Sequence, residues 1–490
     1  MKYTCFYFLS MLLFACSSGE ATNDKSILIK IGESDISDLF FSGKGGSYII
    51  EIESDKEISF SANSNWCDIS KISKTLTKIS LEIKAQPNDL QSKREDVITI
   101  NSVGDNKKIN IYQDIKRPIS NPGAMSRNSK QLAAEMFAGW NMGNSLEAYR
   151  NGSLDTETSW GNPKITKAMI DAVANAGFNA IRIPVRWYPH FIDTDKALVD
   201  EAWINRVKEV VGYCLNNDMF VIINTHHETW LESHAFYADS AEVYRKEYSL
   251  WTQIANAFKD YDERLLFAGT NEVHVDNEFG MPAKAEENTE VQNGMNQVFI
   301  NAVRATGGNN SLRNLIVQTY CANSGWGVDM FVMPDDPTAD RLMVEVHSYD
   351  PWSYAGLEEE KFWGTPYAAY NAGKIGQEKE MEDRFDKLKK KFVDLGYPVI
   401  VGECGAIRHS IAEGENAALI RESRAYYFQM LARTTKNYGA VPFIWDNGSI
   451  RNGSDQFGIF DRKNNMLLID VQAFSAMMKG ALSAKYPFLK

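Results

Sequence analysis

Two apolar segments of the chain each lead to a glutamate. Leu265–Ala268 precedes Asn271 and Glu272, and residues 398–402 precede Glu403. Apolar residues suit a strand that is covered on both faces, whereas a carboxylate inside such a core would be costly, so the polar residues are expected at the rim of a sheet. Paired carboxylates from different strands are what cleavage of a glycosidic bond requires. The alternative, two surface acids in loops, suits one such glutamate better than two.

The elements that must position these glutamates form an alternating pattern. Strands are expected at residues 139–145, 179–185, 220–227, 265–272, 314–320, 342–349, 398–403 and 441–446. Helices are expected between them, at residues 166–176, 201–216, 244–261, 290–306, 378–395 and 420–438. Eight strands separated by helices predict an α/β fold, the (β/α)8 or TIM barrel, whose working face lies at the carboxyl ends of the strands.

Further polar and aromatic residues lie in or at the ends of these expected strands. They are Arg182, His226, His227, Asn271, His347, Tyr349 and Trp445. Because barrel closure gathers the strand ends, these side chains are predicted to form one ligand site with the two glutamates. A structural ion pair for Arg182 and core packing for Trp445 are the alternatives.

Strand alternation tests parts of this grouping. His347 and Tyr349 are two residues apart and face the same way, whereas His226 and His227 face opposite ways unless their strand has ended. His226 is therefore favoured for the site, and His227 suits packing or support behind the site equally well. Tryptophans in the loops after strands suit either platforms in a sugar cleft or packing. They are Trp230, Trp326, Trp352 and Trp363.

The N-terminal segment predicts export. Lys2 is followed by an apolar run at residues 6–15 that is too short to span a membrane. The run ends in Leu-Phe-Ala-Cys, which looks like a bacterial lipobox, so residues 1–16 are expected to be a lipoprotein signal with lipidated Cys16. Residues 17–26 would be a tether, and the protein would be anchored at the cell surface or the periplasmic face of the outer membrane. An ordinary signal peptide is the alternative.

Residues 27–115 alternate apolar and polar positions in short runs, which predicts an antiparallel sandwich of about seven strands. Trp66, Arg94 and the closing Ile-Tyr-Gln at residues 111–113 resemble the BACON domain, which implies an immunoglobulin-like fold with either a sugar-binding or a passive spacer role. Residues 116–128, with Pro118 and Pro122, are predicted to be a linker, and residues 129–490 the barrel.

Several strand-end motifs of the barrel resemble glycoside hydrolase family 5. They are Asn271-Glu272, His347-Ser348-Tyr349, Val401-Gly402-Glu403-Cys404-Gly405 and Phe443-Ile444-Trp445-Asp446. Other motifs are similar to its subfamily 4 of endoglucanases and xyloglucanases. They are Gly139-Trp140-Asn141-Met142-Gly143-Asn144, Trp160-Gly161-Asn162-Pro163, Arg182-Ile183-Pro184-Val185 and Asn224-Thr225-His226-His227-Glu228.

The resemblance implies roles for individual residues. Glu272 would be the acid and base of a retaining mechanism, protonated at rest, and Glu403 the ionised nucleophile. Arg182 would favour ionised Glu403, and Tyr349 would donate a hydrogen bond to it. For the substrate, Asn271 would bind a sugar 2-hydroxyl, His226 and His347 would orient sugar and carboxylates, Trp445 would form the floor, and Asn144 and His227 would add contacts.

The chain also departs from the family pattern. Ala268 stands where a glutamate is common and Val273 where a proline is common, so tuning of Glu272 is expected to differ. Cys404 replaces an aromatic residue and should affect packing more than chemistry. With Cys67, Cys214 and Cys321, it shows no metal-ligand spacing, so the four are interpreted as small buried hydrophobes.

These observations predict a monomeric endo-β-1,4-glycanase that acts on plant β-glucans without cofactor or metal. The net charge of −12 gives no electrostatic footprint for nucleic acid. A Schiff-base enzyme would need a lysine at a strand end, and a metal hydrolase would need a His-x-His or HExxH spacing; neither is present. An endo-β-mannanase and a glycan-binding lipoprotein without catalysis remain alternatives.

Overall fold

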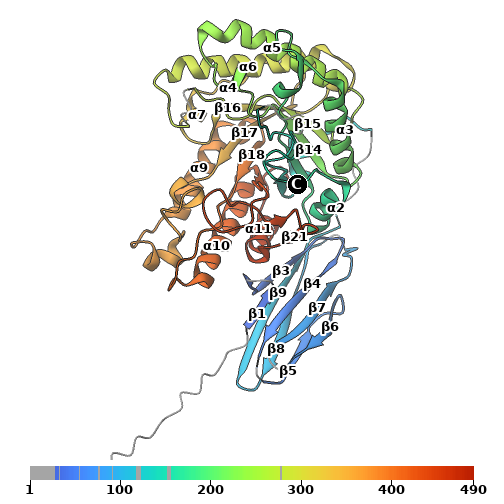
Figure 1. Ribbon diagram of the computed structural model, residues 1–490, viewed down its shortest axis with the longest axis vertical. Coiled ribbons are helices and arrows are strands. Elements are labelled where there is room, and N and C mark those ends of the chain that lie inside the picture. The colour runs from blue at the N-terminus through green and yellow to red at the C-terminus, as the bar shows by residue number, and fades with distance from the viewer. Residues whose placement is uncertain are drawn as a thin grey trace, which may run out of the picture.

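The computed structural model describes residues 28–31, 34–54, 56–75, 78–90, 92–116, 123–151, 156–275 and 279–489. Two parts follow each other along the chain, a β-sandwich and then a larger α/β barrel. In Figure 1 the sandwich lies below the barrel. Cys16 and its surroundings fall outside the described residues. Within the described ranges, no helix combines the length and the apolar character that crossing a bilayer requires.

The larger part is a closed barrel of eight parallel strands, which confirms the predicted (β/α)8 fold. In barrel order they are β10 (Gly139–Asn141), β11 (Ala180–Ile183), β14 (Phe220–Asn224), β15 (Leu265–Ala268), β16 (Leu315–Asn323), β17 (Leu342–Ser348), β18 (Val399–Cys404) and β19 (Ala440–Ile444).

Helices surround the barrel (Figure 1). The longer ones are α2 (Lys167–Ala176), α3 (Glu201–Leu215), α5 (Tyr237–Ala257), α6 (Ala285–Ala305), α9 (Gln377–Lys391), α10 (Ala417–Asn437) and α11 (Val471–Ser483). Short helices and hairpins occupy the connections: α4 (Thr229–Glu232), α7 (Trp326–Met330), α8 (Trp352–Ala355), β12 (Phe191–Asp193) with β13 (Leu198–Val199), and β20 (Phe460–Asp461) with β21 (Leu467–Leu468).

The barrel interior changes from apolar to polar along the strands. Its lower layers are filled by one cluster of buried side chains: Ala180, Phe220, Ile222, Leu266, Ala268, Ile316, Met343, Ile400, Val441 and Phe443. The helix α1 (Ser129–Glu135) closes the amino-terminal end, where Leu132 and Met136 join this cluster. One step further toward the carboxyl ends, the inward positions are polar and include Asn141, Arg182, Gln318 and Glu345, all buried. The polar layer is therefore the floor of a site.

The sandwich consists of two sheets, ordered β2-β1-β4-β7-β6 and β3-β9-β8-β5. Its strands are β1 (Leu28–Ile31), β2 (Ser34–Asp35), β3 (Asp38–Phe41), β4 (Gly46–Glu53), β5 (Ile58–Ala62), β6 (Cys67–Lys74), β7 (Lys78–Ala85), β8 (Arg94–Ser102) and β9 (Asp105–Gln113). The all-β prediction is confirmed, but the strand count and the purely antiparallel pattern were wrong. Residues 28–41 fold into three short strands, and β3 runs parallel to β9, where it closes the edge of the second sheet.

The sandwich packs against the barrel on the side away from the strand carboxyl ends. Phe40 stacks on Phe137, which leads into β10, with ring centroids 6.0 Å apart, and meets Phe474 of α11 edge-on. A side chain at Gly177, which precedes β11, would come within 2.8 Å of the Phe40 ring. Asp38 also pairs with Lys479 at 3.1 Å. This docking leaves the working face of the barrel uncovered.

Candidate active site

Glu403 reaches the barrel interior through a register shift. Ile400 faces inward and Val401 outward, so strict alternation along β18 would turn Glu403 toward the helices. The pairing with β17 advances by one residue here, which leaves Gly402 extra on β18. A bulge of this kind re-aims the side chain that follows it. Glu403 therefore points into the site, while Cys404 is buried among the outward-facing residues, as expected from packing.

The Glu403 carboxylate is held from two sides. Arg182 Nη1 donates to Oε1 at 2.9 Å, and Tyr349 Oη donates to Oε2 at 3.1 Å, so both expected contacts are present. Burial and the charge of Glu403 keep the pKa of Tyr349 well above its ordinary value, so its hydroxyl stays a donor. Burial lowers the pKa of Arg182, but Glu345 and Glu403 raise it above its ordinary value, which leaves a permanent cation beside the carboxylate.

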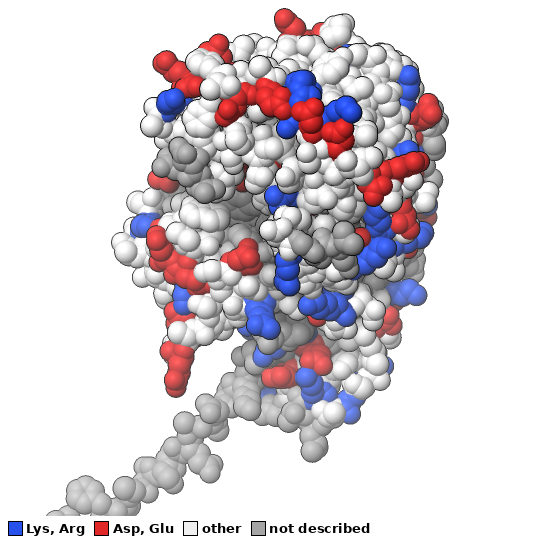
Figure 2. Space-filling model, turned by 45° about the horizontal axis from the view of Figure 1, so that its top comes forward, with Lys and Arg blue, Asp and Glu red and all other residues white. Residues whose placement is uncertain are grey.

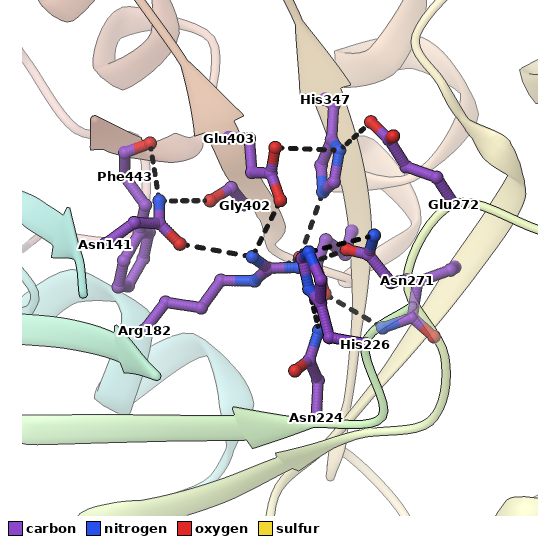
Figure 3. A network of polar contacts seen from close by, with 12 residues as sticks. Asn141, Arg182, Asn224, His226, Asn271, Glu272, His347, Gly402, Glu403 and Phe443 are labelled. Atoms are coloured by element: carbon purple, nitrogen blue, oxygen red, sulfur yellow. Dashed lines mark hydrogen bonds and ion pairs between the residues drawn. The ribbon is translucent and has the colours of Figure 1, made fainter. Parts of the chain in front are cut away.

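Arg182 connects Glu403 to the rest of the polar layer (Figure 3). It is fully buried, and its other contacts are to Asn141 Oδ1 at 3.1 Å, Asn271 Oδ1 at 2.7 Å and Glu345 Oε1 at 2.8 Å. The guanidinium thus orients two amides and two carboxylates at once. A purely structural ion pair would not need this convergence on the site.

Glu272 lies beyond the end of β15 and faces Glu403 across His347 (Figure 3). His347 Nδ1 donates to Glu272 Oε1 at 2.5 Å and lies 3.7 Å from Glu403 Oε2. One carboxylate oxygen of each glutamate lies within 4.8 Å of the other. Retaining glycosidases place their carboxyl groups about 5–5.5 Å apart, whereas inverting enzymes need about 6.5–9.5 Å. The spacing fits a double displacement.

The resting proton is not where the sequence predicted it. Burial alone would lower the pKa of His347, but the charges of Glu403 and Glu272 and the bond to Glu272 raise it to about 10. Burial raises the pKa of Glu272, yet the charge and hydrogen bond of His347 bring it below its ordinary value. Glu272 is therefore ionised in the free site, and the expectation of a protonated Glu272 was wrong. The proton resides on His347, which donates it to Glu272.

Burial acts more strongly on Glu403. It raises the pKa of Glu403 above its ordinary value, against the opposing charges of His347 and Arg182. The Glu403 side chain is 8 % exposed and that of Glu272 is 22 % exposed. A sugar that covers the site would therefore remove more water from Glu272 than from Glu403 and raise the pKa of Glu272 more. This change favours a protonated Glu272 and an ionised Glu403, as the reaction requires.

The two adjacent histidines have different places. The strand β14 ends at Asn224, and the positive φ of 56° at His227 turns the chain out of the sheet. His226 accepts from Asn224 Nδ2 at Nδ1, 3.1 Å away, and its ring is parallel to Trp445 at 6.2 Å. Burial holds the pKa of His226 well below its ordinary value, so the ring is neutral, and its Nε2 lies 3.5 Å from Asn271 Nδ2. His227 is half-buried behind it, 5.8 Å from the Trp160 ring.

Asn271, Trp445 and Asn144 line the sugar side of the site. Asn271 uses Oδ1 for Arg182, which leaves Nδ2 as a donor. The ring of Trp445 is half-buried and rests on Gly143, where a Cβ would come within 2.8 Å of it. Asn144 has a positive φ of 55° and borders, with Trp160, an open cleft of about 770 Å³. Contacts join seven of the sequence-predicted residues into one cluster: Arg182, His226, Asn271, Glu272, His347, Tyr349 and Glu403. Trp445 and His227 lie against the His226 ring, Asn144 lines the open cleft, and Cys16 falls outside the described residues.

The loop tryptophans divide between surface and core. Trp352 is 51 % exposed and meets the edge of Tyr349, so it can serve as a platform. Trp363 is 1 % exposed and packs on Tyr427, so of the two alternatives the structure selects packing for it. Trp230 and Trp326 are half-buried against the cluster beside α5 and α6.

Sequence reasoning missed three polar residues of the floor. Asn141 donates to the Gly402 carbonyl at 2.8 Å and accepts from Arg182. Gln318 and Glu345 are buried on β16 and β17 beneath His347. The signal for Glu345 was present, because it is an acid two residues before His347 in an otherwise apolar strand and must share its face.

Two ionisable glutamates at this spacing, held by an arginine, a tyrosine and a histidine at the carboxyl ends of a (β/α)8 barrel, define a retaining glycoside hydrolase. Comparison with known families agrees. The model of the cellulases of glycosyl hydrolase family 5 matches residues 146–450, and the chain belongs to this family. The BACON domain model matches residues 51–114.

Individual relatives match over most of the chain. The xyloglucan-specific endo-β-1,4-glucanase of Bacteroides ovatus is 35% identical over 461 residues, which cover 90% of this chain and 89% of the relative. Endoglucanase A of Paenibacillus barcinonensis is 37% identical over 378 residues, 72% of this chain and 90% of the relative. The solved Bacteroides ovatus xyloglucanase with a XXXG heptasaccharide superposes with a TM-score of 0.66 at 33% identity, covering 93% of this chain and 100% of that chain.

Proposed function

We propose that this protein is an endo-acting β-1,4-glucanase that cuts plant β-glucans, with xyloglucan and mixed-linkage glucan ahead of mannan. The observation that carries the proposal is the spacing of Glu272 and Glu403 at the carboxyl ends of the barrel strands. The relatives named as a xyloglucan-specific endo-β-1,4-glucanase and an endoglucanase support the choice of backbone.

Each chemical step of a retaining mechanism can be assigned to a residue of the site. Glu403, held by Arg182 and Tyr349, attacks the anomeric carbon while the leaving oxygen takes a proton from Glu272. In this step one C–O bond forms between the anomeric carbon and Glu403, and the C–O bond to the leaving sugar breaks. In the second step Glu272 takes a proton from water, whose oxygen replaces Glu403 with net retention. His347, bonded to Glu272, holds the pair's proton before substrate enters.

The surface suits a neutral polymer. On the face shown in Figure 2, acidic and basic side chains are interspersed. Beside the two glutamates, Asn271 and His226 place polar groups for sugar hydroxyls, and Trp445 offers a ring face to a sugar. A polyanion would meet the net charge of −12.

The test is product analysis with protein that lacks residues 1–16, incubated separately with xyloglucan, barley β-glucan, carboxymethylcellulose and glucomannan. Oligosaccharides of intermediate length from xyloglucan or β-glucan are expected. Release from glucomannan alone would replace the proposal with a mannanase. Binding without any release would replace it with a glycan-binding protein.

We further propose that Cys16 carries a lipid that anchors the protein in the outer membrane. The lipobox-like Leu-Phe-Ala-Cys supports this proposal. Cys16→Ala expressed in a Gram-negative host is expected to move the protein from the membrane fraction to the soluble fraction, because no diacylglycerol can be attached. Cys67→Ala is the matched control, since Cys67 is a buried residue of the sandwich. Unchanged membrane retention of Cys16→Ala would refute the anchor.

A further inference from the structure

One buried carboxylate lies under the site without touching the cleft. Glu345 on β17 is fully buried, and its Oε1 is shared by two cations, Arg182 Nε at 2.8 Å and His347 Nε2 at 3.4 Å. These are the cations that contact Glu403 and Glu272, respectively. Burial raises the pKa of Glu345, but Arg182 and His347 bring it below its ordinary value, so the group is ionised. A single negative charge therefore links both halves of the catalytic pair.

Neighbouring strands fix this carboxylate in place. Gln318 Nε2 donates to Glu345 Oε2 at 2.8 Å, and Gln318 Oε1 accepts from the backbone N–H of Thr270 at 3.0 Å. Asn296 of α6 in turn bonds both backbone groups of Gln318. Since Thr270 stands two residues before Glu272, the chain of hydrogen bonds that holds Glu345 also holds the segment that carries the acid.

The strand of the nucleophile is shaped around the same carboxylate. A Cβ on Gly402 would lie 1.8 Å from Glu345 Oε1, so only glycine leaves room for the carboxylate there. Gly402 is also the extra residue that turns Glu403 inward. At position 268, where the sequence departs from the family pattern, the inward side chain is alanine and carries no charge.

We propose that Glu345 is a positioning residue of the hydrolytic reaction, the shared counter-charge that holds Arg182 against Glu403 and keeps His347 charged against Glu272. The inference deepens the proposed function and rests on it for its activity measurement. Glu345 touches neither substrate nor the reacting atoms. It acts through the two cations.

The proposal fixes the sign of a pH effect. The charged and titratable groups around His347 come from several neighbouring strand ends. They are Arg182 on β11, His226 after β14, Glu272 after β15, Glu345 on β17, Tyr349 directly after β17, and Glu403 on β18. Loss of the Glu345 charge destabilises the imidazolium, so the pKa of His347 falls and the alkaline limb moves to lower pH. Glu345 also raises the pKa of Glu403 by repulsion, so its loss moves the acid limb in the same direction.

Glu345→Gln is expected to shift the whole bell-shaped profile of kcat/KM to lower pH by about one unit or more, and to lower its maximum at least about tenfold. Glu247→Gln is the matched control, because Glu247 on α5 is another fully buried glutamate, and its oxygens have no hydrogen-bond partner among the described residues. Its profile should coincide with that of the wild type. Limbs of Glu345→Gln that coincide with the wild type would overturn the proposal.

A second measurement does not depend on the variant folding or on activity. The chain has 7 histidines, so ¹⁵N-histidine spectra of the wild type are tractable, and His347→Asn identifies the signal. One imidazole is expected to remain charged at pH 8, and titration of His347 near its ordinary value, about 6.5, would overturn the proposal. A wild type inactive on all four polymers would count against the proposed function alone, because the histidine signal is read without substrate.

Discussion

Glu403→Ala is expected to lower kcat on the best polymer by roughly 10⁴-fold or more, about 5 kcal/mol of transition-state stabilisation. The variant retains the acid, the cleft and the floor, but no oxygen remains to form the bond to the anomeric carbon. Azide should restore turnover, because a small anion fits the space beside Arg182 that the carboxylate vacates. The product should be the α-glycosyl azide, since azide attacks directly from the nucleophile side.

Cys404→Ala is the control for Glu403→Ala. Cys404 is the next residue on β18 but faces away from the site, and its Sγ lies 3.4 Å from the Phe443 carbonyl. It should cost some thermal stability and leave kcat within about twofold. Appreciable activity of Glu403→Ala at neutral pH without azide would remove Glu403 as the nucleophile.

The fold was predictable because the strands that build the barrel are apolar and the residues after them are not. All eight expected strands form, but several were drawn too long. Residues 269–272 were assigned to β15, yet the Thr270 N–H donates to the Gln318 side chain and not to a neighbouring backbone. A side chain from a distant segment ends this strand, and no local pattern reveals that.

Within the site, alternation placed His347 and Tyr349 correctly but would have failed for Glu403. Its inward direction depends on the bulge at Gly402, which in turn accommodates the Glu345 carboxylate. The family motif located the nucleophile, while the reason for its orientation is a contact between two strands. The resting protonation was out of reach for the same reason, since it depends on His347 lying 2.5 Å from Glu272.

Glu272→Ala should separate the two chemical steps. On polymers, whose leaving sugars are poor, loss of the proton donor should lower kcat by about 10²–10⁴-fold. On a dinitrophenyl β-glycoside the leaving group needs little protonation, so Glu403 is still expected to form the glycosyl-enzyme at near the wild-type rate. The intermediate should then accumulate, because water lacks its base, and a pre-steady-state burst of dinitrophenol followed by slow turnover would report it.

Azide distinguishes this variant from Glu403→Ala by stereochemistry. It needs no base, so it should intercept the accumulated glycosyl-enzyme of Glu272→Ala and give the β-glycosyl azide, the anomer opposite to that from Glu403→Ala. The alkaline limb on the aryl glycoside should also disappear, since the Glu272 carboxylate that His347 serves as a proton donor is absent. A loss on the aryl glycoside as large as that of Glu403→Ala, without a burst, would contradict the acid and base role. Glu272 would then be needed to form the glycosyl-enzyme, a step that requires no proton with this leaving group.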